Sequence, residues 1–366
     1  MKKDINDIKV AIVHDWLTGM RGGEKVLEAL CEMFPKADIY TLLWNKGSVS
    51  ETIESHKIRT SFLQIMPFVE NKYRYYLPLM FKAIRSFYLD NYDLVISSSH
   101  CVAKGAKVKP GIPHICYCYT PMRYIWDQYE EYFNPERSGL IVSGIMSMIR
   151  KQMQKWDVET SKNVDQFVAI SSCVKERIQR IYGIDSEIIY PPVDVENYQT
   201  SYNGGYYLIV SALVPYKRVD LAIKAFNKLG YQLRIIGSGP DIKRLKSIAS
   251  PNIEFAGWLS DEQIKYNYAG CKAFIFPQEE DFGITSVEAQ AAGKPVIAYR
   301  KGGALDTVVE GKTGIYFNEN DVESLVGAVK IFENTKFSSN GIKANSLKYS
   351  SQRFKNDMAA LIKRHL

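Results

Sequence analysis

The sequence predicts an α/β protein with two doubly wound parallel-sheet domains, and three observations support this fold class. Apolar strand-like runs alternate with amphipathic helix-like runs along nearly the whole chain, which is typical of parallel sheets covered by helices on both faces. The length of 366 residues suits two domains. A break at Pro191-Pro192-Val193-Asp194, followed by a polar stretch to Gly205, divides the alternation into two halves.

Elements of the first half follow from apolar periodicity. Short apolar runs predict strands at Lys9–His14, Asp38–Leu43, Asp93–Ser98, His114–Tyr119, Gln166–Ile170 and Glu187–Tyr190. Helical spacing of apolar residues predicts helices near Glu24–Phe34, Tyr73–Tyr88, Leu140–Lys162 and Cys173–Tyr182. We expect these elements to form an N-terminal domain at residues 1–193.

The second half repeats the alternation more regularly. Its predicted strands are Tyr206–Ser211, Gln232–Ile236, Ile253–Ala256, Ala273–Phe276, Pro295–Tyr299 and Gly314–Phe317. Its predicted helices lie near Val219–Leu229, Asp241–Ala249, Asp261–Ala269, Thr285–Ala292 and Val322–Phe332. We expect a second domain at residues 194–345 and a C-terminal helix at 346–366 that could return to the first domain.

Composition excludes several classes of protein. With 46% hydrophobic and 24% charged residues and a net charge of +7, the chain is typical of soluble globular proteins and has no strongly basic nucleic-acid-binding domain. No run approaches the ~18–20 apolar residues of a membrane-spanning helix, and Asp4 and Asp7 interrupt any signal-peptide pattern. Six cysteines without a CxxC pair and five scattered histidines indicate neither a disulfide framework nor a metal site. The expected location is the cytoplasm, either free or peripheral at the inner face of the plasma membrane.

The segment Glu280-Asp-Phe-Gly-Ile-Thr-Ser-Val-Glu288 separates a predicted strand from a predicted helix. Parallel α/β folds bind ligands at this carboxyl end of a strand, and helix N-termini bind phosphate through backbone N–H groups. The amides that could face an anion belong to Phe282, Gly283 and Ile284. Two carboxylates nearby suit the hydroxyls of a sugar and a ribose, so the segment predicts a nucleotide-sugar site. On spacing alone, Glu280 as a solvated loop charge and Glu288 as a helix-terminus charge explain the pattern equally well.

Two further motifs could serve phosphate. Lys217 and Arg218 lie where the first strand of the second half gives way to a helix, a position that the helix dipole makes unfavourable for cations. A fixed cation there would stabilise a departing nucleotide diphosphate; a solvated surface pair is the alternative. Gly22 and Gly23, in Thr18-Gly-Met-Arg-Gly-Gly-Glu24, precede a predicted helix and would let backbone amides approach an anion; a flexible turn is the alternative.

These motifs together resemble the retaining glycosyltransferases of family 4. That family has the GT-B fold, in which two Rossmann-like doubly wound domains face each other across a cleft. Within it, the chain is most similar to bacterial mannosyltransferases that build O-antigen and capsular polysaccharide. His14-Asp15-Trp16 and Thr120-Pro-Met-Arg-Tyr-Ile-Trp-Asp127 support this subgroup.

The resemblance implies an activity and a set of roles. The expected reaction transfers mannose from GDP-mannose to a lipid-linked oligosaccharide with retention. Lys217 and Glu280 are the implied catalytic residues, and Glu288 would bind the ribose hydroxyls. The other implied donor contacts are Gly22, Gly23, Arg218, Phe282, Gly283, Ile284 and Thr285. A UDP- or ADP-sugar donor is an alternative, and an NAD-dependent sugar-nucleotide-modifying enzyme is another, although the GxGxxG fingerprint is missing.

The sequence departs from the family pattern at two positions. The family usually pairs the lysine with an arginine five residues earlier, where this chain has Ala212, so Arg218 or Arg123 would have to compensate. Tyr119 stands where many relatives carry a histidine. Tyr119, Asp15, His100 and Arg123 are therefore candidates for contacts with the acceptor or with phosphate, and none is assigned as a general base. Because no Asp-x-Asp pair occurs, we expect no required metal and no cofactor.

The segment Tyr73–Tyr88 interleaves aromatic residues with Arg74, Lys82 and Arg85 and contains no acid. Interfacial helices that bind anionic lipid show this combination. A helix whose aromatic residues pack in the core of the first domain would show it too, and both interpretations stay open on sequence alone.

Overall fold

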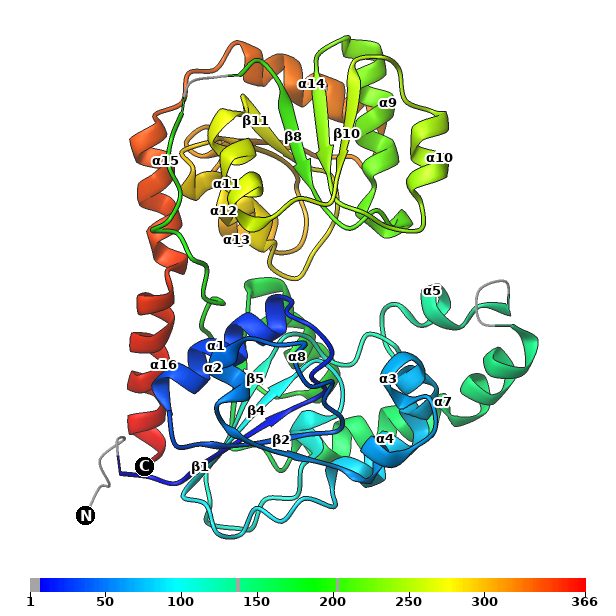
Figure 1. Cartoon of the computed structure of the whole chain (residues 1–366), viewed down its shortest axis with the longest axis vertical. Coiled ribbons are helices and arrows are strands. Elements are labelled where there is room, and N and C mark those ends of the chain that lie inside the picture. Colours follow the sequence, from blue (N-terminus) through cyan, green and yellow to red (C-terminus); the bar gives the residue numbers. More distant parts are fainter. Residues whose placement is uncertain (1–6, 136–138, 202–203) are drawn as a thin grey trace. The chain divides into compact units, whose positions relative to one another are not determined.

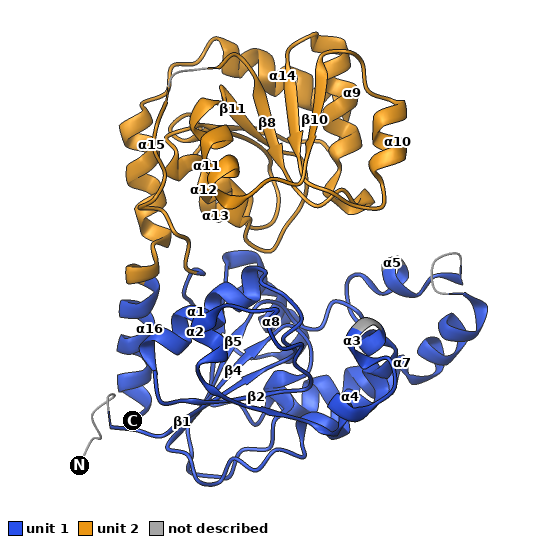
Figure 2. Cartoon of the chain, viewed as in Figure 1, with its two compact units in different colours: residues 1–191, 354–366 blue, residues 192–353 orange. Residues whose placement is uncertain are grey.

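The computed structural model describes residues 7–135, 139–201 and 204–366. The chain divides into two compact units, coloured separately in Figure 2: unit 1 comprises residues 1–191 and 354–366, and unit 2 comprises residues 192–353. Each unit has its own parallel sheet (Figure 1). The predicted parallel α/β organisation of both halves is confirmed.

Unit 1 contains a seven-stranded sheet with the order β3-β2-β1-β4-β5-β6-β7, and the paired strands run parallel. The strands are β1 (Val10–His14), β2 (Asp38–Thr41), β3 (Lys57–Thr60), β4 (Leu94–Ser99), β5 (His114–Cys118), β6 (Gln166–Ala169) and β7 (Ser186–Ile188). Every residue of β1, β4 and β5 is buried, as expected for central strands covered on both faces.

The described residues of unit 1 also form helices. These helices are α1 (Gly22–Met33), α2 (Glu51–Glu54), η1 (Phe62–Ile65), α3 (Val69–Lys72), η2 (Tyr73–Tyr76), α4 (Leu77–Ile84), η3 (Ala103–Gly105), α5 (Tyr129–Phe133), α7 (Leu140–Ser161), α8 (Ser172–Tyr182) and most of α16 (Ser351–His365). Figure 1 shows α3, α4 and α7 gathered at one side of the unit. On α16, Phe354 packs against Tyr117 of β5 with ring centroids 5.6 Å apart.

Two predictions for this half were wrong. The expected continuous helix Tyr73–Tyr88 is a 3-10 turn, η2, followed by the short helix α4, which ends at Ile84. Pro78 lies in the first turn of α4, where proline is tolerated because its missing N–H would have no partner in the helix. Strand β3 was not predicted, because its residues alternate between exposed and half-buried and form no apolar run.

Unit 2 contains a six-stranded sheet with the order β10-β9-β8-β11-β12-β13, also with parallel pairing. The strands are β8 (Tyr207–Val210), β9 (Leu233–Ile236), β10 (Ile253–Gly257), β11 (Ala273–Phe276), β12 (Val296–Tyr299) and β13 (Gly314–Phe317). The helices are η4 (Pro215–Lys217), α9 (Val219–Leu229), α10 (Ile242–Ser247), α11 (Asp261–Gly270), α12 (Ile284–Ala291), α13 (Ala304–Thr307), α14 (Val322–Glu333), α15 (Ser339–Ser346) and η5 (Leu347–Tyr349).

Helix α9 illustrates why the elements form where they do. Its apolar residues recur at helical spacing, and Ala222, Ala225 and Phe226 are fully buried against the sheet. Gly230 ends the helix in the left-handed conformation, with φ of 72°, which glycine adopts without the steric cost that a Cβ would add. Figure 1 shows α9 and α14 together beside the sheet, and their buried residues share one core cluster.

Each sheet reverses its strand order at one place. In unit 1 the reversal lies between β1 and β4, and in unit 2 between β8 and β11. Open α/β sheets bind ligands beyond the carboxyl ends of the strands at such topological switch points. The loops that follow these four strands are therefore where a site is expected.

Candidate functional site

The switch point of unit 2 brings together the two residues predicted to be catalytic. Lys217 ends η4, in the connection after β8, and Glu280 lies in the connection after β11. The ammonium of Lys217 donates a hydrogen bond to Oε1 of Glu280, and the side-chain amide of Gln278 donates to the same oxygen at 2.8 Å. Both charged side chains are partly exposed, at 17% for Lys217 and 25% for Glu280. The pair is thus built into the sheet end and still reachable by a ligand.

Arg218, the neighbour of Lys217, has different partners. Its guanidinium donates to Oδ1 of Asn320 at 2.6 Å and lies 3.5 Å from Asp220. Its backbone adopts the left-handed conformation, with φ of 52°, which costs of order 1 kcal/mol for a residue with a Cβ. This conformation forms the sharp turn between Lys217 and the first residue of α9.

The loop that carries Glu280 is held by a pair of glycines that sequence reasoning missed. The amide of Gly303 donates to the carbonyl of Glu280 at 2.7 Å, and a Cβ on Gly303 would lie 2.3 Å from the Cα of Phe282. Gly302 has φ of +62°, and its Cβ would lie 2.3 Å from the Glu280 carbonyl oxygen. Only glycine allows this approach of two backbones. The available signal was the Gly-Gly pair, which two residues separate from the end of β12.

Helix α12 begins directly after this loop. Gly283 is its N-cap, with φ of +92°, and a Cβ there would lie 2.7 Å from the Phe276 ring. Because glycine has no side chain to cap the helix, the first-turn amides of Ile284 and Thr285 receive no side-chain cap. Both residues are half-buried, whereas Phe282 is buried. The helix start thus combines a positive dipole end with backbone donors, the arrangement that binds anions.

Glu288 lies one turn further along α12, where it is half-buried. The hydroxyl of Tyr268 donates to its Oε2 at 3.0 Å, and Tyr198 also forms a hydrogen bond with the carboxyl group. Burial raises the pKa of Glu288 above its usual range, although both tyrosine donors act in the opposite direction. These tyrosines fix the orientation of the carboxyl group.

The switch point of unit 1 gives Asp15 a role other than the predicted ligand contact. Asp15 follows β1 and is fully buried. Its carboxylate accepts hydrogen bonds, at 2.7–2.9 Å, from the backbone amides of His100, Cys101, Val102 and Ala103, and it lies 3.0 Å from Nδ1 of His100. Burial alone would raise the pKa of Asp15, but His100 and the hydrogen bonds lower it to about 2. Asp15 therefore anchors the loop after β4, because no solvent-facing part of it is left for a ligand.

Tyr119 and the glycine motif are held together in unit 1. Gly22 and Gly23 open α1. The hydroxyl of Tyr119 donates to the carbonyl of Gly23 at 2.8 Å and lies 2.7 Å from Oγ of Ser98. Burial raises the pKa of Tyr119 well above its ordinary value, so the phenol stays protonated and acts as a hydrogen-bond donor. It positions the start of α1.

His14, Glu24 and Ser98 belong to the same cluster and were missed as site residues. Nδ1 of His14 lies 2.9 Å from Oγ of Ser98, and its Nε2 lies 3.8 Å from Oε1 of Glu24. Burial would raise the pKa of Glu24, but the hydrogen bond and charge of His14 lower it overall. The signal was the position of His14 at the end of β1, next to Asp15.

His100 and Arg123 are the remaining predicted contacts of unit 1. The His100 ring packs edge-on against Trp16, with centroids 4.6 Å apart, and its side chain is 28% exposed. Arg123 is half-buried in the turn that follows β5. Both side chains therefore remain partly accessible near the ends of β4 and β5.

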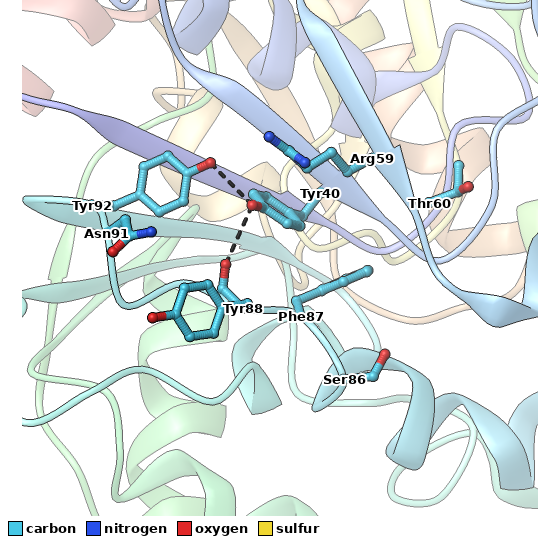
Figure 3. Close-up of a pocket in the computed structure, with 8 residues that line it drawn as sticks. All are labelled: Tyr40, Arg59, Thr60, Ser86, Phe87, Tyr88, Asn91 and Tyr92. Atoms are coloured by element: carbon cyan, nitrogen blue, oxygen red, sulfur yellow. Dashed lines mark hydrogen bonds between the residues drawn. The ribbon is translucent and has the colours of Figure 1, made fainter.

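A separate hollow of about 470 Å³ lies at the β2–β3 edge of unit 1 and is lined by none of the predicted site residues. Figure 3 shows its aromatic wall, where the Tyr40 hydroxyl lies 3.0 Å from the Tyr92 hydroxyl and donates to the Tyr88 carbonyl at 3.3 Å. Tyr92 in turn donates to Asp38 at 2.6 Å. These polar groups bind one another, so the hollow has the character of a structural network.

Within residues 7–135, 139–201 and 204–366, no group of three or more histidine, cysteine, aspartate or glutamate side chains is arranged to hold a metal ion. Among the helices of that same part of the chain, none combines the length and the apolar character needed to cross a bilayer.

Family models match both halves of the chain. "Glycosyltransferase Family 4" matches residues 20–197, and "Glycosyl transferases group 1" matches residues 196–352. An uncharacterized glycosyltransferase of Methanocaldococcus jannaschii is 30% identical over 171 residues, which cover 44% of this chain and 48% of that protein. A GDP-mannose-dependent alpha-(1-6)-phosphatidylinositol monomannoside mannosyltransferase of Mycolicibacterium smegmatis is 31% identical over 169 residues, covering 40% of this chain and 44% of that protein. The chain thus spans about half the length of the curated relatives it matches.

Solved structures resemble the fold over nearly the whole chain. The lipopolysaccharide outer core galactosyltransferase WaaB, in its apo form, has a TM-score of 0.71 at 17% identity and covers 98% of this chain and 100% of its own. HepE of Anabaena, in complex with UDP, has a TM-score of 0.71 at 15% identity and covers 97% of this chain and 100% of its own. At these identities the likeness concerns the fold alone.

Proposed function

Because the chain belongs to glycosyltransferase family 4, we propose that it transfers a sugar from a nucleotide-sugar donor to an acceptor hydroxyl, with the donor bound at the switch point of unit 2. The observation that carries this proposal is the contact between Lys217 and Glu280 beside the start of α12. A diphosphate leaving group gains negative charge as the glycosidic bond breaks. A fixed ammonium and a helix N-terminus stabilise that charge more in the transition state than in the bound donor.

The carboxylates serve the neutral parts of the donor in this proposal. Once phosphate engages Lys217, Glu280 accepts hydrogen bonds from hydroxyls of the sugar, while the amide of Gln278 keeps the carboxylate in place. Glu288, oriented by Tyr268 and Tyr198, accepts hydrogen bonds from the ribose hydroxyls. Charge-assisted hydrogen bonds of this kind are worth ~1.5–3 kcal/mol each.

Arg218 and the motifs of unit 1 complete the set of proposed contacts. Arg218, in place of the arginine absent at position 212, would reach phosphate by exchanging its contact with Asn320. The half-exposed His100 and Arg123, together with the amides of Gly22 and Gly23, are the proposed groups of unit 1 for phosphate or acceptor. The partial exposure of these side chains supports this assignment.

We further propose mannose from GDP-mannose as the donor sugar, transferred with retention to a lipid-linked oligosaccharide of a surface polysaccharide. Mannosyltransferases that depend on GDP-mannose occur among the relatives, which supports this choice over UDP- or ADP-sugars; the UDP complex of HepE keeps UDP-sugars as the second candidate. In the retaining scheme, the nucleoside diphosphate leaves and the acceptor hydroxyl attacks on the same face of the donor sugar. The phosphate of the leaving group takes the proton of the acceptor hydroxyl. Lys217 and the α12 amides carry the leaving-group charge, so no metal ion is required.

Association with the inner face of the membrane belongs to the same proposal. Within residues 73–88, Tyr73 and Phe87 pack in the core, but Tyr75 and Tyr88 are 70% and 64% exposed, and Arg74, Lys82 and Arg85 are also exposed. The buried side of this segment packs against the domain, and its exposed aromatic and basic side chains support contact with a lipid surface. Replacing Lys82 and Arg85 with serine should reduce pelleting with anionic vesicles and leave donor binding unchanged.

The test of the function is donor selection. Thermal stability should rise with GDP, and product analysis with GDP-mannose, UDP-glucose, UDP-galactose and ADP-glucose should show transfer from GDP-mannose to a lipid-linked glycan acceptor. Stabilisation by NAD with no effect of any nucleoside diphosphate would instead support the NAD-dependent class. Transfer from a UDP-sugar alone would keep the reaction and replace the donor.

A further inference from the structure

A groove in unit 1, away from the donor residues, has the chemistry of a binding site. Its volume is about 610 Å³, within the ~300–1,000 Å³ typical of ligand pockets. One wall comes from residues 72–80 of α3, η2 and α4, and the other from the start of α7 and the segment 124–133. In Figure 1 these elements lie together at one side of the unit. The two walls of the groove therefore come from segments that are far apart in the sequence.

The inner end of the groove reaches the switch point of unit 1. Trp16, which lines the groove, directly follows Asp15 after β1. Its ring lies 4.6 Å from the His100 ring and 5.0 Å from the Tyr73 ring, measured between centroids. Trp16 therefore links the groove to His100, the proposed acceptor contact: one side of its ring system lines the groove and the ring also contacts His100.

The lining is apolar, and it continues onto exposed apolar surface. Val142, Ile145 and Met146 of α7 face the groove opposite Leu77 and Met80 of α4. Ile145 is 51% exposed. Beyond the rim, α7 also exposes Leu140, Ile141 and Met148, each about 80%. Several large apolar side chains exposed on one helix are typical of an interaction surface.

Two cations, Lys72 and Arg74, complete the described lining. None of the described residues that line the groove is acidic. Within the described residues, no carboxylate forms an ion pair with either cation. Their recorded partners are rings: Nζ of Lys72 lies 5.7 Å from the Phe68 centroid, and Cζ of Arg74 lies 5.2 Å from that of Tyr73. The complementary ligand carries an anion next to an apolar chain.

We propose that this groove binds the apolar tail of an amphiphilic phosphate- or diphosphate-linked acceptor, with Lys72 and Arg74 holding its anionic group. The identification as an acceptor rests on the proposed glycosyl transfer; the binding of the amphiphile does not. A walled groove suits a single lipid chain, whereas a bilayer would contact the exposed rim as much as the walls. Substitutions in the walls and on the rim therefore distinguish a single lipid chain from a bilayer.

The experiment is calorimetric titration of the full chain with farnesyl diphosphate below its critical micelle concentration, without membranes. Farnesyl diphosphate should bind at least about tenfold more tightly than farnesol or inorganic pyrophosphate, because each of these lacks one of the two interactions. Ile145→Glu should weaken binding about tenfold or more, since it puts a carboxylate into the groove. Met148→Glu, on the same helix but outside the lining, should bind like the parent chain.

A second matched pair tests the anion. Arg74→Ser should weaken binding of farnesyl diphosphate by roughly ten- to a hundredfold, whereas Lys109→Ser, exposed in unit 1 but outside the lining, should leave it unchanged. Equal losses of affinity for farnesyl diphosphate in Ile145→Glu and Met148→Glu would overturn the groove proposal and indicate binding to the exposed apolar surface of α7. Pyrophosphate that binds as tightly as farnesyl diphosphate would overturn the tail site, and binding to anionic vesicles alone would assign the surface to a bilayer.

Failure of the groove and failure of the function give different results. If farnesyl diphosphate binds as expected but no nucleotide sugar is consumed, the glycosyl transfer is wrong and the amphiphile site stands. If transfer to a lipid-linked acceptor occurs with the same acceptor KM in Ile145→Glu as in the parent chain, the groove proposal is wrong and the function stands.

Discussion

The two switch points have the same topology and opposite chemistry. In unit 1 the carboxylate beyond the strand ends, Asp15, is fully buried and accepts hydrogen bonds from four backbone amides. In unit 2 the corresponding carboxylate, Glu280, is partly exposed and is held by the side chains of Lys217 and Gln278. Backbone donors cannot leave a partner without moving the fold, but side-chain donors can turn to a ligand. One switch point is therefore fixed, and the other can exchange its partners.

The largest effect should follow from breaking the fixed switch point. Asp15→Ala leaves four buried N–H groups without an acceptor, each at a cost of ~1–3 kcal/mol, so the free energy of unfolding should fall by about 3 kcal/mol or more. Chemical denaturation followed by circular dichroism measures this, with the exposed Asp90→Ala as the control. A loss below about 1 kcal/mol would contradict the anchoring role. If Asp15→Ala does not fold, Asp15→Asn, which keeps one acceptor oxygen, should lose less stability.

Acidification tests the same anchor without a mutation. The pKa of Asp15 is about 2 in the folded chain, against about 3.9 in an unfolded one. A pKa that is lower in the folded chain stabilises the folded state fully at pH values above the unfolded-state pKa. This stabilisation is lost as the pH falls from that value through about 2. This contribution amounts to roughly 2–3 kcal/mol, and Asp15→Asn should lack it.

Lys217→Ala tests the exchangeable switch point. Removing a half-exposed ion pair should change stability by only ~0–1 kcal/mol, whereas kcat should fall ~10²–10³-fold because the growing charge of the leaving group loses its cation. Steady-state kinetics with the nucleotide-sugar donor distinguish a role of Lys217 in catalysis, which lowers kcat, from a role in donor binding, which raises KM. A raised donor KM at unchanged kcat would show that Lys217 only binds the donor. Lys301→Ala, an exposed lysine near Glu279, is the matched control.

Glu288→Ala should weaken binding of the nucleoside diphosphate by roughly ten- to a hundredfold, since the ribose hydroxyls lose an anionic acceptor. Glu279→Ala, an exposed carboxylate outside the proposed contacts, is its control in calorimetric titration. Because the pKa of Glu288 is raised, its protonation begins at a higher pH than for an ordinary glutamate. Affinity should therefore decline as the pH falls through that raised value, and the decline should be absent in Glu288→Ala. Parent-like affinity in a folded variant would refute the ribose contact.

The smallest expected effect is that of a chelator. If Lys217 and the first-turn amides of α12 carry the charge of the leaving group, EDTA should leave turnover unchanged. Loss of activity with recovery on adding Mg²⁺ or Mn²⁺ would show that a divalent ion fills this role. In that case a divalent ion would be a further partner of Glu280 at the switch point of unit 2.

The sequence was sufficient to predict that Lys217 and Glu280 lie at the same sheet edge; that they bind a ligand there stays a prediction. Lys217 and Glu280 each follow a central strand of the second half, so the parallel order of those strands already places both at one sheet edge. The contact between them, and the hydrogen bonds of Tyr268 and Tyr198 to Glu288, depend on rotamers and on the packing of segments far apart in the sequence, which no local pattern specifies. The Gly302–Gly303 pair was overlooked because its function is to approach a loop about twenty residues earlier in the chain.

The backbone partners of Asp15 could not be foreseen from the sequence, for a topological reason. The amides that saturate Asp15 belong to residues 100–103, more than eighty positions later, and only the adjacency of β1 and β4 brings them together. A carboxylate with no partner nearby in the sequence therefore resembled a ligand contact. The helix expected at 73–88 failed for a local reason, since the segment begins as a 3-10 turn and Pro78 belongs to the first turn of a new helix.

The C-terminal helix sets an order of events during synthesis. Fifteen residues form α16, and its Phe354, Met358, Leu361 and Ile362 are buried in a unit that otherwise ends at Pro191. On the ribosome, unit 1 therefore emerges first but waits for the whole of unit 2 to be translated before it receives its last helix. Its β5 residue Tyr117, which packs against Phe354, remains uncovered until then. Unit 1 thus begins before unit 2 and is completed after it, and a chain that stops before residue 354 would release unit 1 with this surface exposed to chaperones and proteases.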